Sequence, residues 1–378
     1  MNIDDLIPRT ELKTPWLLSR LRELVELESP SEDPAAVNRA MEMVAGWAEE
    51  LGGKVKRHRQ KGFGDVYELR FGPRSSRRRP VLLLGHLDTV WAHGTLKTMP
   101  WQEKDGKIYG PGTLDMKVGV MMALAAIAIL KELSVNAPVT LLLNPDEEVG
   151  SPVSRPITEK VALESSAVFV LEPAQVLALK TARKGIGNYQ VHVAGVASHS
   201  GVDFERGHSA VLELARQIER ISAFTDLPSG RTVNCGVISG GTRSNVIAAE
   251  AAVEVDVRIA RASDAKKVDR FFAGLKPFDK ACKLTVTGGI NRPPMERKAG
   301  TIALFRQAKK LAAQLGFEVD EAATGGGSDG NFTAALGVPT LDGMGAVGAG
   351  AHASHEHFVV EHLVPRTALL AAMIATTA

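Results

Sequence analysis

Side chains that can bind metal ions follow three short apolar runs of the chain. The runs span residues 81–84, 139–143 and 167–171. Continuous apolar runs of this length are typical of strands buried on both faces, and therefore of a largely parallel sheet. In such sheets, ligands bind beyond the carboxyl ends of the strands. The polar residues that follow the runs are His86 and Asp88, then Asp146, Glu147 and Glu148, and finally Glu172.

Two further segments carry the same kinds of side chain. Asp115 ends the turn-rich segment 110–115, directly before a helical pattern that begins near Met116. The C-terminal segment 350–357 holds three histidines, namely His352, His355 and His357. A set of imidazoles and carboxylates suits zinc, with cobalt or manganese as substitutes.

The spacing of these residues suggests how they divide the chemistry. Asp88 lies two residues after His86, so its carboxylate can hydrogen-bond the far imidazole nitrogen and orient the ring. Adjacent Glu147 and Glu148 cannot point the same way from an extended segment. One of them can bind metal while the other takes the proton of a metal-activated water, as hydrolysis requires. A single histidine after a strand is more often structural, and a Glu-Glu pair is usually solvated, but several strand ends with ligands favour a metal site.

Length and composition set wider limits on the protein. A chain of 378 residues suggests two domains, and its net charge of +2 gives no argument for nucleic acid or a membrane as partner. Cys235 and Cys282 are too few for a disulfide framework or a thiolate zinc site. Two basic clusters, 54–61 and Arg74 with 77–79, are interpreted as solvated loops or edges.

Two stretches of the sequence bear on location. The apolar stretch 118–130 is too short to span a bilayer and predicts a buried helix. The N-terminal residues lack the pattern of a secretory signal, so we expect a cytoplasmic protein.

The element pattern predicts a main domain with an insertion. Residues 16–52 show helical periodicity that Gly52 and Gly53 end. Residues 184–292 instead predict the order strand, helix, strand, strand, helix, strand, which is typical of a ferredoxin-like α+β domain. We therefore expect an α/β catalytic domain, with a mostly parallel sheet flanked by helices, over 1–183 and 293–378.

Seven short motifs, in order along the chain, resemble those of the M20 family of metallopeptidases, especially its glutamate carboxypeptidase branch. The resemblance extends from about residue 16 to 375. The motifs are Gly-His-Leu-Asp-Thr-Val at 85–90, Gly-Pro-Gly-Thr-Leu-Asp-Met-Lys at 110–117, Asp-Glu-Glu-Val-Gly-Ser at 146–151, Leu-Glu-Pro at 171–173, Ala-Ser-His-Ser-Gly at 197–201, Val-Asp-Val-Arg at 255–258 and Thr-Gly-Gly-Gly-Ser-Asp at 324–329. Each is weak alone, and the ordered set is highly specific.

The resemblance implies a zinc-exopeptidase-like catalytic domain with two zinc ions per subunit. Asp115 would bridge the two ions. His86 and Glu172 would complete one site, and Glu148 with a C-terminal histidine the other. Glu147 would be the general base and Asp88 would orient His86. His352 is the best match for the C-terminal ligand because Glu356 and an aromatic-then-apolar segment follow it, with His355 as the alternative.

The resemblance also assigns roles to the inserted domain, as a lid and as the surface of a homodimer. His199 would stabilise the oxyanion in the partner's active site. Arg258 would grip the substrate carboxylate, because a guanidinium fork suits a carboxylate. Asn245 would contact the substrate nearby, and Gly326 would let the backbone approach it. Arg292 stays open as a hinge residue, a substrate contact or neither.

These implications leave more than one function open. The first is a co-catalytic zinc carboxypeptidase that cleaves a peptide or amide bond next to a free carboxylate. The second keeps the machinery but deacylates an N-acyl amino acid or a biosynthetic amide. A non-catalytic metal-binding homologue is disfavoured because both Glu147 and Asp115 are present.

Overall fold

The computed structural model describes residues 2–73 and 78–378 and divides into two compact units. Unit 1 comprises the chain up to Ala182 together with Arg297–Thr324 and Ser328–Ala378, and unit 2 comprises Arg183–Glu296 with Gly325–Gly327. The boundaries expected from the sequence, 184 and 292, lie close to those of unit 2. The glycine segment 325–327 also belongs to unit 2, which the sequence pattern did not indicate.

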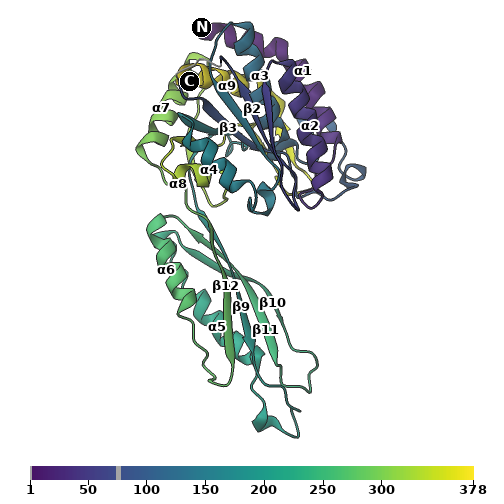
Figure 1. Ribbon diagram of the computed structural model, residues 1–378, viewed down its shortest axis with the longest axis vertical. Helices are drawn as coiled ribbons and strands as arrows, with labels where there is room; N and C mark the ends of the chain where they lie inside the picture. Colours follow the sequence, from purple (N-terminus) through teal and green to yellow (C-terminus); the bar gives the residue numbers. More distant parts are fainter. Residues whose placement is uncertain (1, 74–77) are drawn as a thin grey trace. The chain divides into compact units, whose positions relative to one another are not determined.

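A six-stranded mixed sheet forms the centre of unit 1 (Figure 1). Its strands in spatial order are β1 (Lys54–His58), β2 (Val66–Phe71), β6 (Val139–Asn144), β3 (Val81–His86), β7 (Ala167–Val170) and β14 (Thr340–Leu341). The pairs β6–β3, β3–β7 and β7–β14 are parallel, whereas β1 and β2 add an antiparallel edge. The carboxyl ends of β6, β3 and β7 therefore meet at one edge of the sheet.

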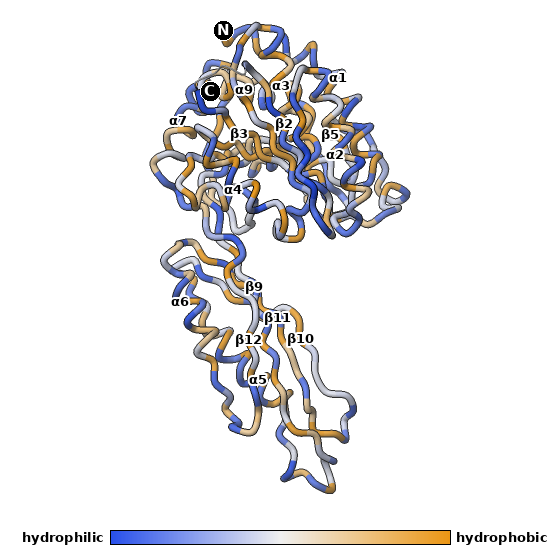
Figure 2. Tube along the Cα trace, viewed as in Figure 1, coloured by the Kyte–Doolittle hydropathy of each residue, from blue (hydrophilic) through white to orange (hydrophobic). Residues whose placement is uncertain are grey.

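Helices cover both faces of this sheet because alternate strand residues are apolar on each side. On one face, Leu83, Leu141 and Phe169 pack into the main core. The helices that contribute to this core are α1 (Leu6–Glu26), α2 (Pro34–Glu50), α3 (Val118–Glu132), α7 (Ala299–Gln314) and α9 (Leu363–Thr377). On the other face, Leu84 and Leu142 pack in a second cluster with α4 (Arg155–Leu163). Figure 2 shows the central strands as hydrophobic stretches.

Helix α3 is the most deeply buried helix near the site. All residues from Val118 to Leu130 are buried. Among the residues that the structure describes, one helical segment, Thr113–Glu132, is long and apolar enough to cross a membrane; its most apolar 18 residues have a mean hydropathy of 1.8, and 94% of them are buried inside the protein. A core helix has the same properties, as the sequence predicted for 118–130.

The first helical region differs from its prediction. The single periodic stretch 16–52 is in fact two helices, α1 and α2, separated by residues 27–33. Asp33 caps α2 by accepting hydrogen bonds from the N–H groups of Ala35 and Ala36, and Pro34 occupies the first helical position. Helix α1 begins ten residues earlier than the predicted start, at Leu6.

The first basic cluster, 54–61, was predicted to be a solvated loop or edge, and it contains an edge strand. Strand β1 lies at the end of the sheet order and exposes Lys54, Lys56 and Arg57. Exposed lysines on an edge strand oppose pairing with other chains. Arg74 and Arg77 of the second basic cluster lie outside the described residues.

A small antiparallel sheet connects two segments that are far apart in sequence. Its order is β15 (Gly348–Ala349), β16 (His357–Val359), β5 (Lys107–Tyr109) and β4 (Gln102–Lys104). His357 pairs with Tyr109, and their rings lie 5.0 Å apart. This pairing places the segment that leads to Asp115 beside the loop that carries His352.

Unit 2 has the predicted order of elements. These are β9 (Gly185–Ala194), α5 (Ala210–Ser222), β10 (Thr232–Gly240), β11 (Glu250–Ile259), α6 (Ala262–Ala273) and β12 (Lys283–Arg292). The four strands form one antiparallel sheet in the order β10-β11-β9-β12. Alternate residues such as Val191, Val253 and Val257 pack with α5 and α6, which lie over the same face in Figure 1. The opposite face carries polar side chains, which explains the alternating sequence pattern.

Candidate metal centre

The strand ends bring the expected ligands together in unit 1. His86 is the last residue of β3, and its neighbour on β6 is Asn144, three residues before Glu147. Glu172 follows the end of β7, which pairs with the other side of β3. His86 and Glu172 are buried, with 1% and 7% of their surface exposed. Parallel pairing alone therefore places these side chains around one point.

Asp115 lies between two imidazoles. It has non-helical backbone angles (φ −113°, ψ 93°) between a helical turn and α3, which directs its side chain toward the strand ends. Its Oδ1 lies 3.3 Å from Nε2 of His86, and its Oδ2 lies 3.3 Å from Nε2 of His352. Each oxygen thus faces a different imidazole, which is the arrangement that a bridging carboxylate needs.

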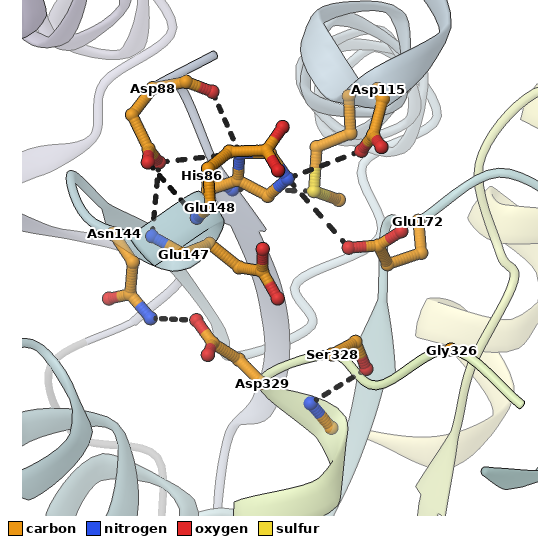
Figure 3. Close-up of polar contacts among 12 residues, drawn as sticks. His86, Asp88, Asp115, Asn144, Glu147, Glu148, Glu172, Gly326, Ser328 and Asp329 are labelled. Atoms are coloured by element: carbon orange, nitrogen blue, oxygen red, sulfur yellow. Dashed lines mark hydrogen bonds and ion pairs between the residues drawn. The ribbon is translucent and has the colours of Figure 1, made fainter. Parts of the chain in front are cut away.

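Glu172 and Glu148 extend the two halves of this arrangement. Glu172 Oε1 lies 3.7 Å from Nε2 of His86, and Glu148 Oε2 lies 3.1 Å from Nε2 of His352. Figure 3 shows the Asp115 and Glu172 carboxylates directed at His86 from different elements. Each imidazole is therefore within reach of two carboxylates, of which Asp115 is common to both.

The donor set fits two metal ions. Donor atoms about 2.0–2.2 Å from a tetrahedral zinc ion lie roughly 3.3–3.6 Å from one another. The four separations around the two imidazoles, 3.1 to 3.7 Å, agree with this spacing. Within the described part of the chain, Nε2 of His86 is buried and has no hydrogen-bond partner of good geometry, although carboxylate oxygens lie near it. A buried polar atom of this kind needs a partner, and a cation would supply it.

The charges of the cluster favour the same conclusion. Asp115 and Glu148 raise the pKa of His352 to about 10. Burial opposes protonation of His86, but Asp115 and Asp88 outweigh it and raise its pKa well above the usual value. Conversely, burial alone would raise the pKa of Asp115, and the two imidazoles hold it well below its usual range. The carboxylates thus stabilise positive charge at the two imidazoles. A bound metal ion would supply that charge in place of the imidazole protons.

Asp88 contacts more of the site than the sequence suggested. Its side chain is fully buried, and its Oδ1 lies 3.4 Å from Nδ1 of His86. The shorter contact of Nδ1, at 3.0 Å, is with the backbone oxygen of Asp88. The carboxylate also accepts the N–H groups of Glu147 and Glu148 at 3.2 and 3.1 Å, and the hydroxyl of Ser31 at 2.7 Å. Asp88 therefore holds both the His86 ring and the turn that carries the two glutamates.

The adjacent glutamates belong to different groups of ligand atoms. Glu148 groups with His86 and Asp115, whereas a carboxylate oxygen of Glu147 lies within 4.8 Å of donor atoms of His86 and Glu172. Figure 3 shows the Glu147 carboxylate extending toward the space between these two residues. Glu147 thus lies on the side of the cluster that His86 and Glu172 form, whereas Glu148 lies beside His352.

The structure distinguishes the three C-terminal histidines. His352 lies against the carboxylate cluster, with its Nε2 3.3 Å from Asp115 and 3.1 Å from Glu148. It adopts φ 62°, an uncommon value for a residue other than glycine. His355 is exposed and packs beside Gly350, and the ring of His357 lies tilted by 37° against Tyr109 and contacts the oxygen of His355. The geometry thus favours His352 as the ligand.

Several contributors to the site were given no role of their own by the sequence. Asp329 accepts hydrogen bonds from Asn144 (2.6 Å) and Ser151 (2.5 Å), and so holds the far side of the glutamate turn. Glu356 is buried and accepts N–H groups of the Asp115 segment. In the sequence, Glu356 served only to identify His352 as the best match for the C-terminal ligand. Finding these partners requires the tertiary contacts, because they lie far away along the chain.

The expected lid residues all belong to unit 2. Nδ1 of His199 accepts the N–H groups of Gly201 (3.1 Å) and Val202 (3.2 Å), so the ring proton of the neutral form resides on Nε2. Asn245 lies on the neighbouring segment, and its backbone oxygen accepts the N–H of Ser200. The structure therefore fixes which His199 nitrogen can donate a hydrogen bond.

The two arginines and the glycine segment also pack within unit 2. Arg258 forms a bidentate pair with Asp256, and its Nη1 lies 3.4 Å from the oxygen of Gly325. The oxygen of Gly326 accepts a hydrogen bond from Arg183. Arg292 is buried, and its side chain lies against Gly327.

Comparison with known proteins gives the family. The model of peptidase family M20/M25/M40 matches residues 82–376. Carboxypeptidase G2 of Pseudomonas sp. (strain RS-16) is 31% identical over 376 residues, which cover 95% of this chain and 88% of that protein. The chain belongs to peptidase family M20. The family and the carboxypeptidase-type hydrolase that the motifs predicted are thereby confirmed.

Further relatives of this M20 chain are more diverse. Acetylornithine deacetylase of Proteus mirabilis is 26% identical, covering 65% of this chain and 68% of that protein. Aminopeptidase PepT of Bacillus cereus has a similar structure, with a TM-score of 0.78 at 22% identity and coverage of 96% and 98% of the two chains. YXEP of Bacillus subtilis, described as a dinuclear metal-binding peptidase of the family, has a TM-score of 0.69 at 15% identity, covering 97% and 98%. These structures confirm the fold class.

Proposed function

We propose that this M20 hydrolase cleaves a peptide or amide bond next to a free carboxylate with the help of two metal ions. The observation that carries the proposal is the position of Asp115, whose two oxygens each face a different imidazole at 3.3 Å. His86 and Glu172 would hold one ion and His352 and Glu148 the other. Zinc suits these ligands, with cobalt or manganese as substitutes.

When bound, such ions polarise the carbonyl of the substrate and make a water molecule easier to deprotonate. The carboxylate of Glu147 would take the proton from the attacking water and later give it to the leaving nitrogen. Asp88 keeps Glu147 in place, since its carboxylate accepts the Glu147 N–H. The base is thus fixed at its backbone, and its carboxylate would receive the proton of the water.

Unit 2 would bind the substrate and stabilise the developing charge. Nε2–H of His199 is the available donor for an oxyanion, because Nδ1 already accepts two backbone N–H groups. Asp256 occupies Nε and Nη2 of Arg258, and Nη1 donates to the oxygen of Gly325, so the second N–H of Nη1 would meet a substrate carboxylate. We assign the same substrate-binding role to Asn245 and to the backbone at Gly326.

A second candidate is the deacylation of an N-acyl amino acid. The similarity to acetylornithine deacetylase supports it. Both reactions attack an amide carbonyl near a carboxylate, so the same residues would serve either. Hydrolysis rates on matched sets of dipeptides and N-acyl amino acids, measured with zinc or cobalt, would rank the two candidates.

We also infer a homodimer formed through unit 2. Strand β10 is an edge of the unit 2 sheet and exposes Val237 (57%) and Ile238 (60%). Helix α5 exposes Leu212 (54%). Exposed apolar side chains on an unpaired edge are typical of a protein–protein interface.

The deciding experiment compares neighbouring glutamates. Glu147→Gln should keep two zinc ions per chain while kcat falls by about 10²- to 10⁴-fold, because proton transfer is lost and the ligands remain. Glu148→Gln should instead lose zinc from one site. Zinc content by atomic emission and kcat on an active dipeptide or acyl amino acid measure both effects. Full activity of Glu147→Gln would contradict the mechanism.

A further inference from the structure

Glu356 has a carboxylate that is fully buried and accepts four N–H groups. Its Oε1 accepts the backbone N–H groups of Leu114 at 2.8 Å and of Asp115 at 3.0 Å. Its Oε2 accepts the N–H of Gly112 at 3.0 Å and the indole N–H of Trp91 at 2.8 Å. Three of the four donors thus belong to the segment that carries Asp115.

Glu356 lies on the loop that carries His352. The N–H of Glu356 bonds to the oxygen of Ala353, and the N–H of Ala353 bonds to the oxygen of Gly350. The loop is therefore tightly turned between His352 and Glu356. The carboxylate of Glu356 joins this loop to the Asp115 segment. At the proposed metal site, Nε2 of His352 on the loop lies 3.3 Å from Oδ2 of Asp115.

We propose that Glu356 is a positioning residue that holds Asp115 and His352 at the spacing of a metal site before any metal binds. This inference rests on the proposed function, since it assumes that Asp115 and His352 are ligands. Preorganisation of this kind raises metal affinity, because the unliganded protein does not have to bring the two segments together.

The contacts require a carboxylate and not merely a polar group. Each of the two oxygens accepts two N–H groups. An amide at the same place has one oxygen and one NH₂ group, which cannot accept. In either orientation, glutamine would therefore direct its NH₂ at two N–H donors. The substitution Glu356→Gln keeps the size of the side chain and removes half of its acceptors.

Unit 2 provides a matched control for this substitution. Glu213 is also buried, and its carboxylate accepts the backbone N–H groups of Phe278 and Asp279 and the amide of Gln217. Glu213 holds a loop of unit 2, whereas the expected metal ligands belong to unit 1. Glu213→Gln should therefore lower the unfolding temperature and leave the zinc affinity of the folded protein unchanged.

The experiment titrates metal-free wild type, Glu356→Gln and Glu213→Gln with zinc against a chromophoric chelator, well below their unfolding temperatures. We expect Glu356→Gln to weaken binding at one or both sites by about 10- to 100-fold, as partners of ligating residues typically do. Wild-type zinc affinity in a folded Glu356→Gln protein would overturn the inference, because Glu356 would then be only structural. Failure of wild type to bind two ions would instead overturn the proposed function.

A second measurement covers the case in which Glu356→Gln does not fold. Hydrogen exchange of metal-free wild type should show protection of the amides of Gly112, Leu114 and Asp115, comparable with that of the metal-loaded protein. Exchange of these amides at the rate of an open loop would show that the segment is ordered only by metal, and would overturn the inference.

Discussion

At Asp115, a single carboxylate separates two imidazoles that come from opposite ends of the chain. His86 approaches from a strand end and His352 from a C-terminal loop, and both Nε2 atoms lie 3.3 Å from an oxygen of Asp115. A hydrogen bond could connect one imidazole to this carboxylate for purely structural reasons. Two imidazoles, each with a second carboxylate beside it, are better explained by paired cations.

The C-terminal ligand gives a test at the same scale. His352→Ala should lower the zinc content from two ions toward one and weaken the affected site by more than about 100-fold, since it removes a ligand and not just a partner of one. His355→Ala changes a nearby exposed histidine and should leave the zinc content at the wild-type level. Zinc titration of both metal-free variants makes the comparison. Loss of zinc in His355→Ala alone would reverse the assignment.

The sequence predicted the ligands of this proposed metal centre but not all of the residues that hold those ligands in place. The position of His86, Glu148 and Glu172 after apolar runs was enough to place them at one sheet edge, because parallel strands bring their carboxyl ends together. The family resemblance favoured His352 among the three C-terminal histidines, and the fold supports that choice because its Nε2 lies 3.3 Å from Asp115. Glu356 and Asp329 act through partners far away along the chain, and no local pattern indicates such contacts.

At the scale of elements, α3 approaches the chain closely at Leu171, between the end of β7 and Glu172. Gly119, in the first turn of α3, packs so closely against the carbonyl of Leu171 that a Cβ would overlap it. Leu171 cannot shift freely, because its N–H bonds to the oxygen of Leu84 on β3. The residue after Leu171 is Glu172, so this contact affects the metal centre as well as the core.

A pair of glycine substitutions tests this packing. Gly119→Ala should destabilise the protein by about 1–3 kcal/mol, because the added methyl overpacks a rigid contact. Gly46→Ala makes the same change within α2, where a Cβ has no neighbour within 4 Å. It should stabilise the protein by about 0.5–1 kcal/mol through helix propensity. Urea unfolding of the metal-free proteins measures both, and an unchanged stability for Gly119→Ala would contradict the packing argument.

The elements also show where periodicity is insufficient. Helical spacing over 16–52 continued across the break at 27–33, because Val37, Met41 and Val44 of α2 face the same core as the apolar residues of α1. The basic run at 54–61 contains the edge strand β1. Its lysines interrupt the apolar pattern by which a strand is recognised in a sequence. In contrast, the buried strands β3, β6 and β7 were predicted to within two residues, since their burial on both faces leaves a continuous apolar signal.

At the scale of the whole molecule, the chemistry is divided between two units. The proposed metal ligands and the proposed base Glu147 belong to unit 1, whereas His199 and Arg258, which we propose to act on the substrate, belong to unit 2. Unit 2 exposes apolar side chains on strand β10, which we interpret as a dimer surface. If His199 serves the partner's metal centre, a complete active site needs residues from two chains.

Mixing two inactive variants tests this division. His199→Ala and Glu147→Gln should each be nearly inactive alone. After subunit exchange of equal amounts, about half of the dimers are mixed, and each of these has one site with both residues intact. Activity should therefore recover to about a quarter of that of wild type. Each variant exchanged with itself is the control. If subunit exchange is verified by mass and activity stays at the level of the controls, then His199 does not act in the partner's site.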